Sequence, residues 1–168
     1  PPAAAAIPDL PAVDTGTLDE VARELALARE PLIVTEELGR NIAAVDALVR
    51  LADALGAPVV DAWHCDYVNF PHDHALYGGI AVEEMKALVD AADLVLLAEA
   101  VAPWHPASSL PSVGTRVITL GESPLHPHIP VWNFRADRVV QGAAGPALAA
   151  LAERVAPLIS AAQRAERL

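Results

Sequence analysis

Short apolar runs without polar alternation are the feature that most constrains the fold of this chain. The runs PLIVT, DLVLL and RVITL occupy residues 31–35, 93–97 and 116–120. A strand that is apolar at nearly every position is buried on both faces, which is typical of parallel sheets covered by helices on each side. Two shorter runs, at residues 58–61 and 138–141, complete a set of five predicted strands.

Helical patterns alternate with these strands. Helices are predicted at residues 17–28, 42–55, 82–90 and 146–155. Residues 17–20 (TLDE) have the form of a capping box with Thr17 as N-cap, Asn41 can cap the second helix, and Gly56 can end it. The alternation predicts an α/β fold: a Rossmann-like, doubly wound, mainly parallel sheet with helices on both faces.

The chain is expected to hold one domain between two connecting segments. Residues 1–16 are rich in Pro and Ala and are predicted to be a linker. Residues 17–157 form the predicted domain, and residues 158–168 are a predicted tail or linker. Because the first residue is Pro1 and not Met, we expect the domain to be a piece of a longer protein.

Charge and cysteine content exclude several classes of partner. The formal net charge of −11 argues against nucleic acids and anionic membranes, because both are bound through Lys and Arg. The apolar runs are too short for a transmembrane span. The single cysteine, Cys65, excludes an internal disulfide and favours a cytoplasmic location.

The carboxyl ends of parallel strands are where such folds bind ligands. After the first predicted strand, Gly39, Arg40 and Asn41 lie in a turn that could face a phosphate at a helix N-terminus. The turn lacks both the G-x-G-x-x-G pattern and the P-loop pattern, and its two glutamates would repel an anion. An ordinary connection between strand and helix is therefore the preferred interpretation.

Histidines and a cysteine gather in residues 64–74, which contain HCD and HDH. These residue types bind zinc, and a metal-dependent hydrolase is one alternative function. The loop contains neither C-x-x-C nor H-E-x-x-H, and no G-x-S-x-G elbow occurs in the chain. We therefore expect no metal site and no catalytic residue here.

Aromatic residues are few, and most of them fall in predicted loops at or beyond strand ends. Exposed aromatics are enriched at protein interfaces. We predict interface contacts for Trp63, Tyr67, Phe70, Trp104 and Trp132.

Six segments occur in an order that resembles a known family. They read REPLIVTEELGRN, LADALGAPVVDA, NFPHDHALYGG, AADLVLLAEAVAPW, TRVITLGESPLHP and ADRVVQGAAGPALAALAERV. In this order and spacing, residues 18–155 resemble the central domain of acetolactate synthase-like thiamine diphosphate enzymes. Those enzymes have three α/β domains, with the activating glutamate in the first and a Gly-Asp-Gly…Asn motif for diphosphate and Mg²⁺ in the third. Neither motif occurs here.

The resemblance implies a non-catalytic scaffold domain of a larger enzyme. That enzyme would be a lyase or transferase that acts on carbon–carbon bonds of 2-oxo acids with thiamine diphosphate and Mg²⁺. Its N-terminal and C-terminal domains are the implied partners of this chain, and a homo-oligomer is the expected assembly.

Some central domains of the family carry FAD or an ADP group, and others are empty. Three departures from the family pattern favour the empty class: Glu99 after the third strand, residues 121–124 (GESP) after the fourth, and the pair Gly142-Ala143. Glu99 weighs most, because a carboxylate there repels a diphosphate. If a nucleotide did bind, it would contact Gly39, Arg40, Asn41, Glu99, Gly121, Glu122 and Ser123. The alternative function is therefore a free-standing domain that binds FAD, NAD or ADP.

Overall fold

A five-stranded parallel sheet forms the centre of the computed structural model, which describes residues 10–62, 66–80, 82–104 and 110–167. The strands are β1 (Pro31–Thr35), β2 (Val59–Asp61), β3 (Leu94–Ala98), β4 (Arg116–Gly121) and β5 (Arg138–Gln141). They lie in the order β2-β1-β3-β4-β5, and every neighbouring pair is parallel. All five predicted strands and the predicted parallel sheet are confirmed.

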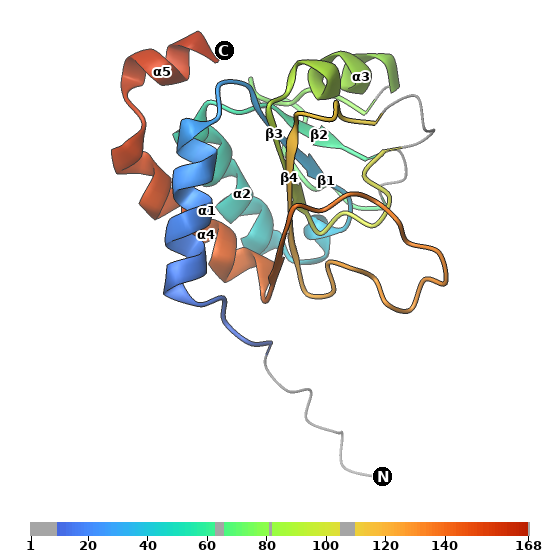
Figure 1. Ribbon diagram of the computed structural model, residues 1–168. Coiled ribbons are helices and arrows are strands. Elements are labelled where there is room, and N and C mark those ends of the chain that lie inside the picture. Colours follow the sequence, from blue (N-terminus) through green and yellow to red (C-terminus); the bar gives the residue numbers. More distant parts are fainter. Residues whose placement is uncertain (1–9, 63–65, 81, 105–109, 168) are drawn as a thin grey trace.

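Helices cover both faces of this sheet, as predicted. The helices are α1 (Thr15–Leu27), α2 (Ile42–Leu55), α3 (Val82–Ala91), α4 (Ala144–Val155) and α5 (Ala161–Glu166), with short 3-10 turns η1 (Leu38–Arg40) and η3 (Ala156–Leu158). Figure 1 shows α1, α2 and α4 together on one side of the sheet and α3 on the other. Alternate residues of β1 enter the two cores: Ile33 faces the three-helix side, whereas Leu32 and Val34 face the side of α3.

The helix ends follow the predicted chemistry at two positions and depart from it at one. The Asn41 side chain accepts from the backbone N–H of Ala43, and Gly56 ends α2 with a left-handed φ of 65°. Thr17 is not the N-cap of α1, so that prediction was wrong. Asp14 caps the helix instead, with its carboxylate 2.9 Å from the backbone nitrogen of Thr17, since a carboxylate caps as well as a hydroxyl.

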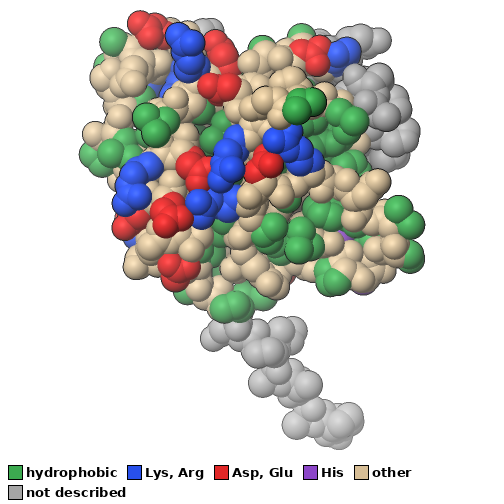
Figure 2. Space-filling model, viewed as in Figure 1, with side chains coloured by type: hydrophobic (Ala, Val, Ile, Leu, Met, Phe, Trp, Pro, Cys, Tyr) green, Lys and Arg blue, Asp and Glu red, His purple; other side chains and the backbone are tan. Residues whose placement is uncertain are grey.

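A row of ion pairs holds α1 against its neighbours. Arg138, at the start of β5, contacts Glu20 and Glu24 of α1. Arg154 of α4 contacts Asp19, also on α1. Figure 2 shows that acidic and basic side chains lie side by side on this face of the molecule. The pairs are partly exposed, so each contributes little alone, but together they specify how α1 lies on the domain.

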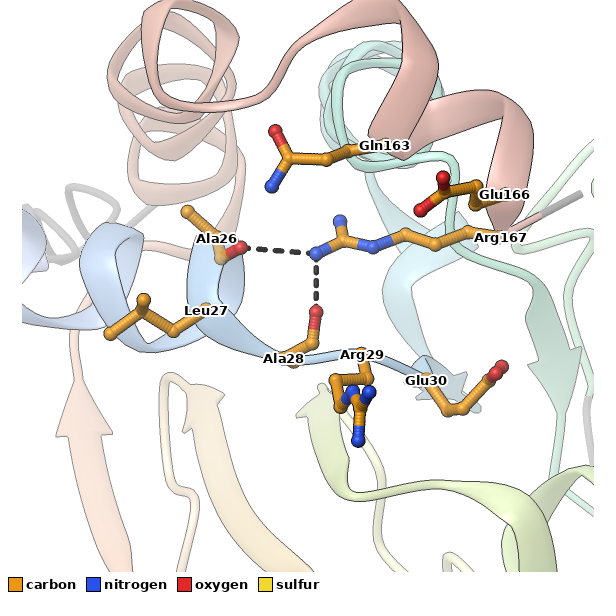
Figure 3. Close-up of a pocket in the computed structure, with 8 residues that line it drawn as sticks. All are labelled: Ala26, Leu27, Ala28, Arg29, Glu30, Gln163, Glu166 and Arg167. Atoms are coloured by element: carbon orange, nitrogen blue, oxygen red, sulfur yellow. Dashed lines mark hydrogen bonds between the residues drawn. The ribbon is translucent and has the colours of Figure 1, made fainter.

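The C-terminal residues return to the body of the domain. Ser160 and Gln163 form a capping box at the start of α5. The Arg167 guanidinium, just beyond that helix, donates to the carbonyl oxygens of Ala26, Ala28 and Leu55. Figure 3 shows it reaching into a cavity of about 550 Å³ between α5 and the end of α1. The guanidinium thus pairs carbonyls at the ends of two helices, where a positive charge is favoured.

Candidate functional site

The topological switch of the sheet lies between β1 and β3. The chain leaves β1 for β2 on one side and returns to β3 on the other, and ligands of open α/β sheets bind beyond such points. Two neighbouring cavities of about 200 and 250 Å³ lie here, which we call the edge cavities. Glu37, Arg40, Glu99 and Glu122 line both of them.

Glu99, the first residue after β3, is held at the centre of this edge. Its backbone is left-handed, with φ of 50°, and the residue is 9% exposed. One carboxylate oxygen lies 2.9 Å from the backbone nitrogen of Glu122, and the other lies 3.3 Å from Nη2 of Arg40. Burial raises the pKa of this carboxyl and outweighs the hydrogen bond from Glu122 and the charge of Arg40.

Glu36, directly after β1, is the residue whose role the sequence reasoning missed. It is 7% exposed. Its Oε2 accepts from the backbone nitrogens of Val101 and Ala102, at 2.6 and 2.7 Å. The sequence signal for this role is an acid directly after a buried strand, which by itself indicates only a charge that repels anions.

The structure brings some of the predicted nucleotide-binding residues together and uses others elsewhere. Arg40, Glu99, Glu122 and Ser123 line the larger edge cavity, and Gly121 lies against the carboxylate of Glu99.

Gly39 and Asn41 have other roles. The backbone N–H of Gly39 donates to the side chain of Asn69, 2.8 Å away, and Asn41 caps α2. The turn that could have faced a phosphate is therefore already engaged within the domain.

This arrangement does not fit a diphosphate. The backbone N–H groups of Val101, Ala102 and Glu122 would suit phosphate oxygens, but Glu36 and Glu99 already accept from them. An incoming anion would meet two buried carboxylates. Among the residues that the structure describes, Arg40 is the only Lys or Arg whose side chain lines the edge cavities.

His126 is a second unusual residue at this edge. It is buried, with φ of 42°, and its Nε2 lies 3.2 Å from the carbonyl oxygen of Ala100. Burial lowers the pKa of the imidazole. Its ring contacts the rings of His128 and Trp132, which favours a neutral packing role.

Two of the five predicted interface aromatics lie in the core of the domain. Phe70 is 0% exposed and Trp104 is 2% exposed, so neither presents its side chain on this surface. Phe70 packs into the three-helix core, and the Trp104 ring lies against that of Phe134. The expectation of surface contacts through these two residues is corrected accordingly.

The other three predicted interface aromatics differ from this pair. Tyr67 is 42% exposed. Trp132 is half-buried and donates from its indole nitrogen to the carbonyl oxygen of Val101, at 2.7 Å. Trp63 lies outside the described residues. An interface role for Tyr67, Trp63 and Trp132 remains a prediction.

The histidine loop pairs with carboxylates of the domain body. Nε2 of His72 lies 3.4 Å from Asp61, and Nε2 of His74 lies 3.5 Å from Asp53. Within the part of the chain that the structure describes, no group of three or more His, Cys, Asp or Glu could hold a metal ion. His64 and Cys65 of the proposed cluster fall outside that part.

Among the described residues, none of the helices has the length and hydrophobicity that a membrane span requires.

Comparison with solved structures finds many similar chains, and three of them show how far the likeness extends. A putative thiamin diphosphate-dependent enzyme isolated from Mycobacterium smegmatis is 28% identical over 91% of this chain, with a TM-score of 0.71. Benzoylformate decarboxylase from Polynucleobacter necessarius is 18% identical over 90%, with a TM-score of 0.75. The thiamine diphosphate-dependent 4-hydroxybenzoylformate decarboxylase of Rhodococcus jostii RHA1 is 22% identical over 91%, with a TM-score of 0.69. The matches cover 30%, 29% and 29% of those chains.

Sequence comparison points to the same family. No curated protein matches the chain. The family model of the thiamine pyrophosphate enzyme central domain matches residues 18–125. This range includes β1 to β4 and the two buried glutamates, Glu36 and Glu99. The chain therefore belongs to the family of thiamine pyrophosphate enzyme central domains.

Proposed function

We propose that this chain is the non-catalytic, nucleotide-free central domain of a thiamine diphosphate-dependent enzyme acting on 2-oxo acids. Its work is to space the two cofactor-binding domains and to supply contact surface between them. The observation that carries this proposal is the carboxyl edge of the sheet, where Glu36 and Glu99 accept from the backbone N–H groups that a nucleotide phosphate would need.

Catalysis and cofactor binding are assigned to the rest of the enzyme. The Gly-Asp-Gly…Asn motif does not occur in the sequence, and the carboxyl edge does not fit a diphosphate. The chain spans about 30% of the length of the similar solved chains. We infer that thiamine diphosphate and Mg²⁺ bind the missing N-terminal and C-terminal domains, in a homo-oligomer located in the cytoplasm.

The substrate class rests on chemistry shared by the relatives. Two of the similar structures are decarboxylases of benzoylformate or 4-hydroxybenzoylformate, which are 2-oxo acids. The order of motifs resembles acetolactate synthase-like enzymes, which also act on 2-oxo acids. A 2-oxo acid lyase or transferase accommodates both lines of argument.

The contact surface is proposed at the same end of the domain. Tyr67 is exposed, and so is Val131, at 78%, in the loop that precedes β5. Trp132 is partly exposed beside it. These residues are the proposed contacts with the missing domains.

A free-standing nucleotide-binding domain is the second candidate, and one observation favours it. Arg40 borders both edge cavities and is 42% exposed at its side chain, so it could meet a phosphate, with the exposed Glu122 near a ribose. This candidate predicts that the chain binds FAD, NAD or ADP without the other domains.

Thermal unfolding separates the two candidates. A ligand present at 100 times its Kd adds about 2.7 kcal/mol to the free energy of unfolding. We expect no rise in Tm with FAD, NAD or ADP at millimolar concentration. A rise with any of them would replace the scaffold proposal with nucleotide binding.

A second experiment tests the place of the domain in the parent enzyme. The intact protein from the same gene should turn over 2-oxo acids with thiamine diphosphate and Mg²⁺, while this chain alone should not. The purified intact protein should release no flavin or adenine nucleotide on denaturation. A released nucleotide in stoichiometric amount would contradict the proposal.

A further inference from the structure

Two buried carboxylates each reach from the end of one strand to the loop that follows its neighbour. Glu36 follows β1 and accepts from backbone groups in the loop after β3. Glu99 follows β3 and accepts from the backbone of Glu122, after β4. Since β1, β3 and β4 are adjacent in the sheet, the pair connects three consecutive strand ends.

The contact of Glu36 has the geometry of a bound anion. Two successive backbone N–H groups, of Val101 and Ala102, converge on one oxygen at 2.6 and 2.7 Å. Successive N–H groups that point to one place form a concave anion site, and bonds from them to a charged oxygen are short. The bound oxygen here is supplied by the chain itself.

The space around Glu99 is shaped for its carboxylate. A Cβ at Gly121 would lie 3.0 Å from the Cδ and Oε2 atoms of Glu99, closer than ordinary packing allows. The backbone of Glu99 is left-handed, which is uncommon for a residue other than glycine. Both features place the carboxylate at the Glu122 amide.

We propose that the loops after β3 and β4 form an oxyanion-binding site that the chain fills itself. The carboxylates of Glu36 and Glu99 occupy the positions that the oxygens of a phosphate ligand would take. The inference rests on the proposed function and deepens it: the carboxyl edge of the sheet binds no nucleotide because the carboxylates of Glu36 and Glu99 occupy its anion site. Small oxyanions such as phosphate are the ligand class that the same amides would take once the carboxylates are removed.

Removal of the carboxylates should therefore expose an anion site. The variants are Glu36→Ala and the double variant Glu36→Ala with Glu99→Ala, measured in phosphate against chloride at equal ionic strength. Phosphate at about ten times its Kd should raise Tm of these variants by about 3–6 °C. Acetate should give a smaller rise, because it carries less negative charge at neutral pH than phosphate does.

The matched control is Glu122→Ala. It removes one negative charge from the same edge but leaves the Glu122 backbone N–H bonded to Glu99. Neither this variant nor the wild-type chain should respond to phosphate beyond the response to chloride. An equal phosphate response in the control or the wild type, or none in Glu36→Ala, would overturn the inference.

A second measurement applies if the alanine variants do not fold. Glu36→Gln keeps an acceptor oxygen of the same reach without the charge. In amide NMR spectra, the Val101 and Ala102 protons of the wild type should both lie downfield of their positions in Glu36→Gln, because a charged oxygen accepts from them more strongly than a neutral one. Unchanged positions of both protons in Glu36→Gln would contradict the inference.

Failure of this inference and failure of the proposed function give different results. A wild-type chain that binds ADP or FAD overturns the nucleotide-free function. Alanine variants that ignore phosphate, with a wild type that binds no nucleotide, overturn only the built-in anions and leave the scaffold role in place.

Discussion

At both ends of the sheet, charged side chains pair with backbone groups, but the two ends use opposite charges. At the carboxyl end, carboxylates of Glu36 and Glu99 accept from loop N–H groups. At the amino end, where α1 and α2 finish, the Arg167 guanidinium donates to carbonyl oxygens of Ala26, Ala28 and Leu55. Each end places the charge that its backbone dipoles favour.

The two ends differ in the role that their backbone groups would have without these charged side chains. Exposed N–H groups at the carboxyl end of a parallel sheet are a ligand site in many α/β proteins, whereas the carbonyls at helix C-termini at the amino end mainly need partners. The carboxylates therefore remove a binding function in addition to their structural role, while Arg167 has a structural role alone. The larger cavity, about 550 Å³ beside Arg167, is for this reason not the site on which function rests.

The largest expected effect is at Glu36. Glu36→Ala leaves two N–H groups without their charged acceptor, and we expect a loss of about 3 kcal/mol in the free energy of unfolding. Urea denaturation measures it. Glu122→Ala, at an exposed position of the same edge, should stay within about 0.5 kcal/mol of the wild type. Equal losses in the two variants would make Glu36 an ordinary surface acid.

Next comes Arg167, the counterpart at the amino end. Arg167→Ala should cost about 2 kcal/mol by urea denaturation, because carbonyls from two helix ends lose a charged donor. Arg167→Lys should recover only part of this loss, since one ammonium cannot span the same oxygens. Neither variant should gain phosphate binding. A phosphate response at this end would remove the functional contrast between the two ends.

Gly121 gives a smaller effect that isolates Glu99. Gly121→Ala should cost about 1–2 kcal/mol, because the new methyl group crowds the Glu99 carboxylate. In a double-mutant cycle with Glu99→Ala the two losses should not add, since they share one contact. Additive losses would show that the glycine serves another purpose.

The smallest effect is a pH dependence. Burial raises the pKa of Glu99 above 4.5 in the folded chain. The folded state therefore holds this proton more tightly than the unfolded state. The stabilisation that this proton gives the folded state is complete below pH 4.5 and is lost as the pH rises through the pKa that Glu99 has in the folded state. As the pH is lowered from 7 to 4.5, the free energy of unfolding of the wild type should rise relative to that of Glu99→Gln. Urea titrations at several pH values measure this difference. A difference that stays constant over this range would contradict the assignment.

Local sequence chemistry predicted the elements of the fold well. Uninterrupted apolar runs identify the strands because burial on both faces leaves no polar position. Asn41 and Gly56 mark the ends of α2 because capping depends on neighbours within one turn. Ser160 and Gln163 carried the same kind of signal for α5, and the pattern S-x-x-Q could have predicted it.

Long-range contacts were beyond the sequence. The bonds from Glu36 to Val101 and Ala102 depend on β1 and β3 being neighbours, which the sheet order decides. The burial of Phe70 and Trp104 depends on contacts with residues distant in the sequence, such as that between the rings of Trp104 and Phe134. The importance of Glu99 was predicted through family resemblance, whereas its acceptance of the Glu122 amide needed the structure.

A crystal structure of the chain grown with ADP or FAD at millimolar concentration tests the central claim most directly. We predict a Glu36 oxygen on the amides of Val101 and Ala102, the Glu99 carboxylate on the amide of Glu122, and no nucleotide at the carboxyl end of the sheet. Phosphate oxygens on those amides, with the two glutamates turned away, would contradict the account.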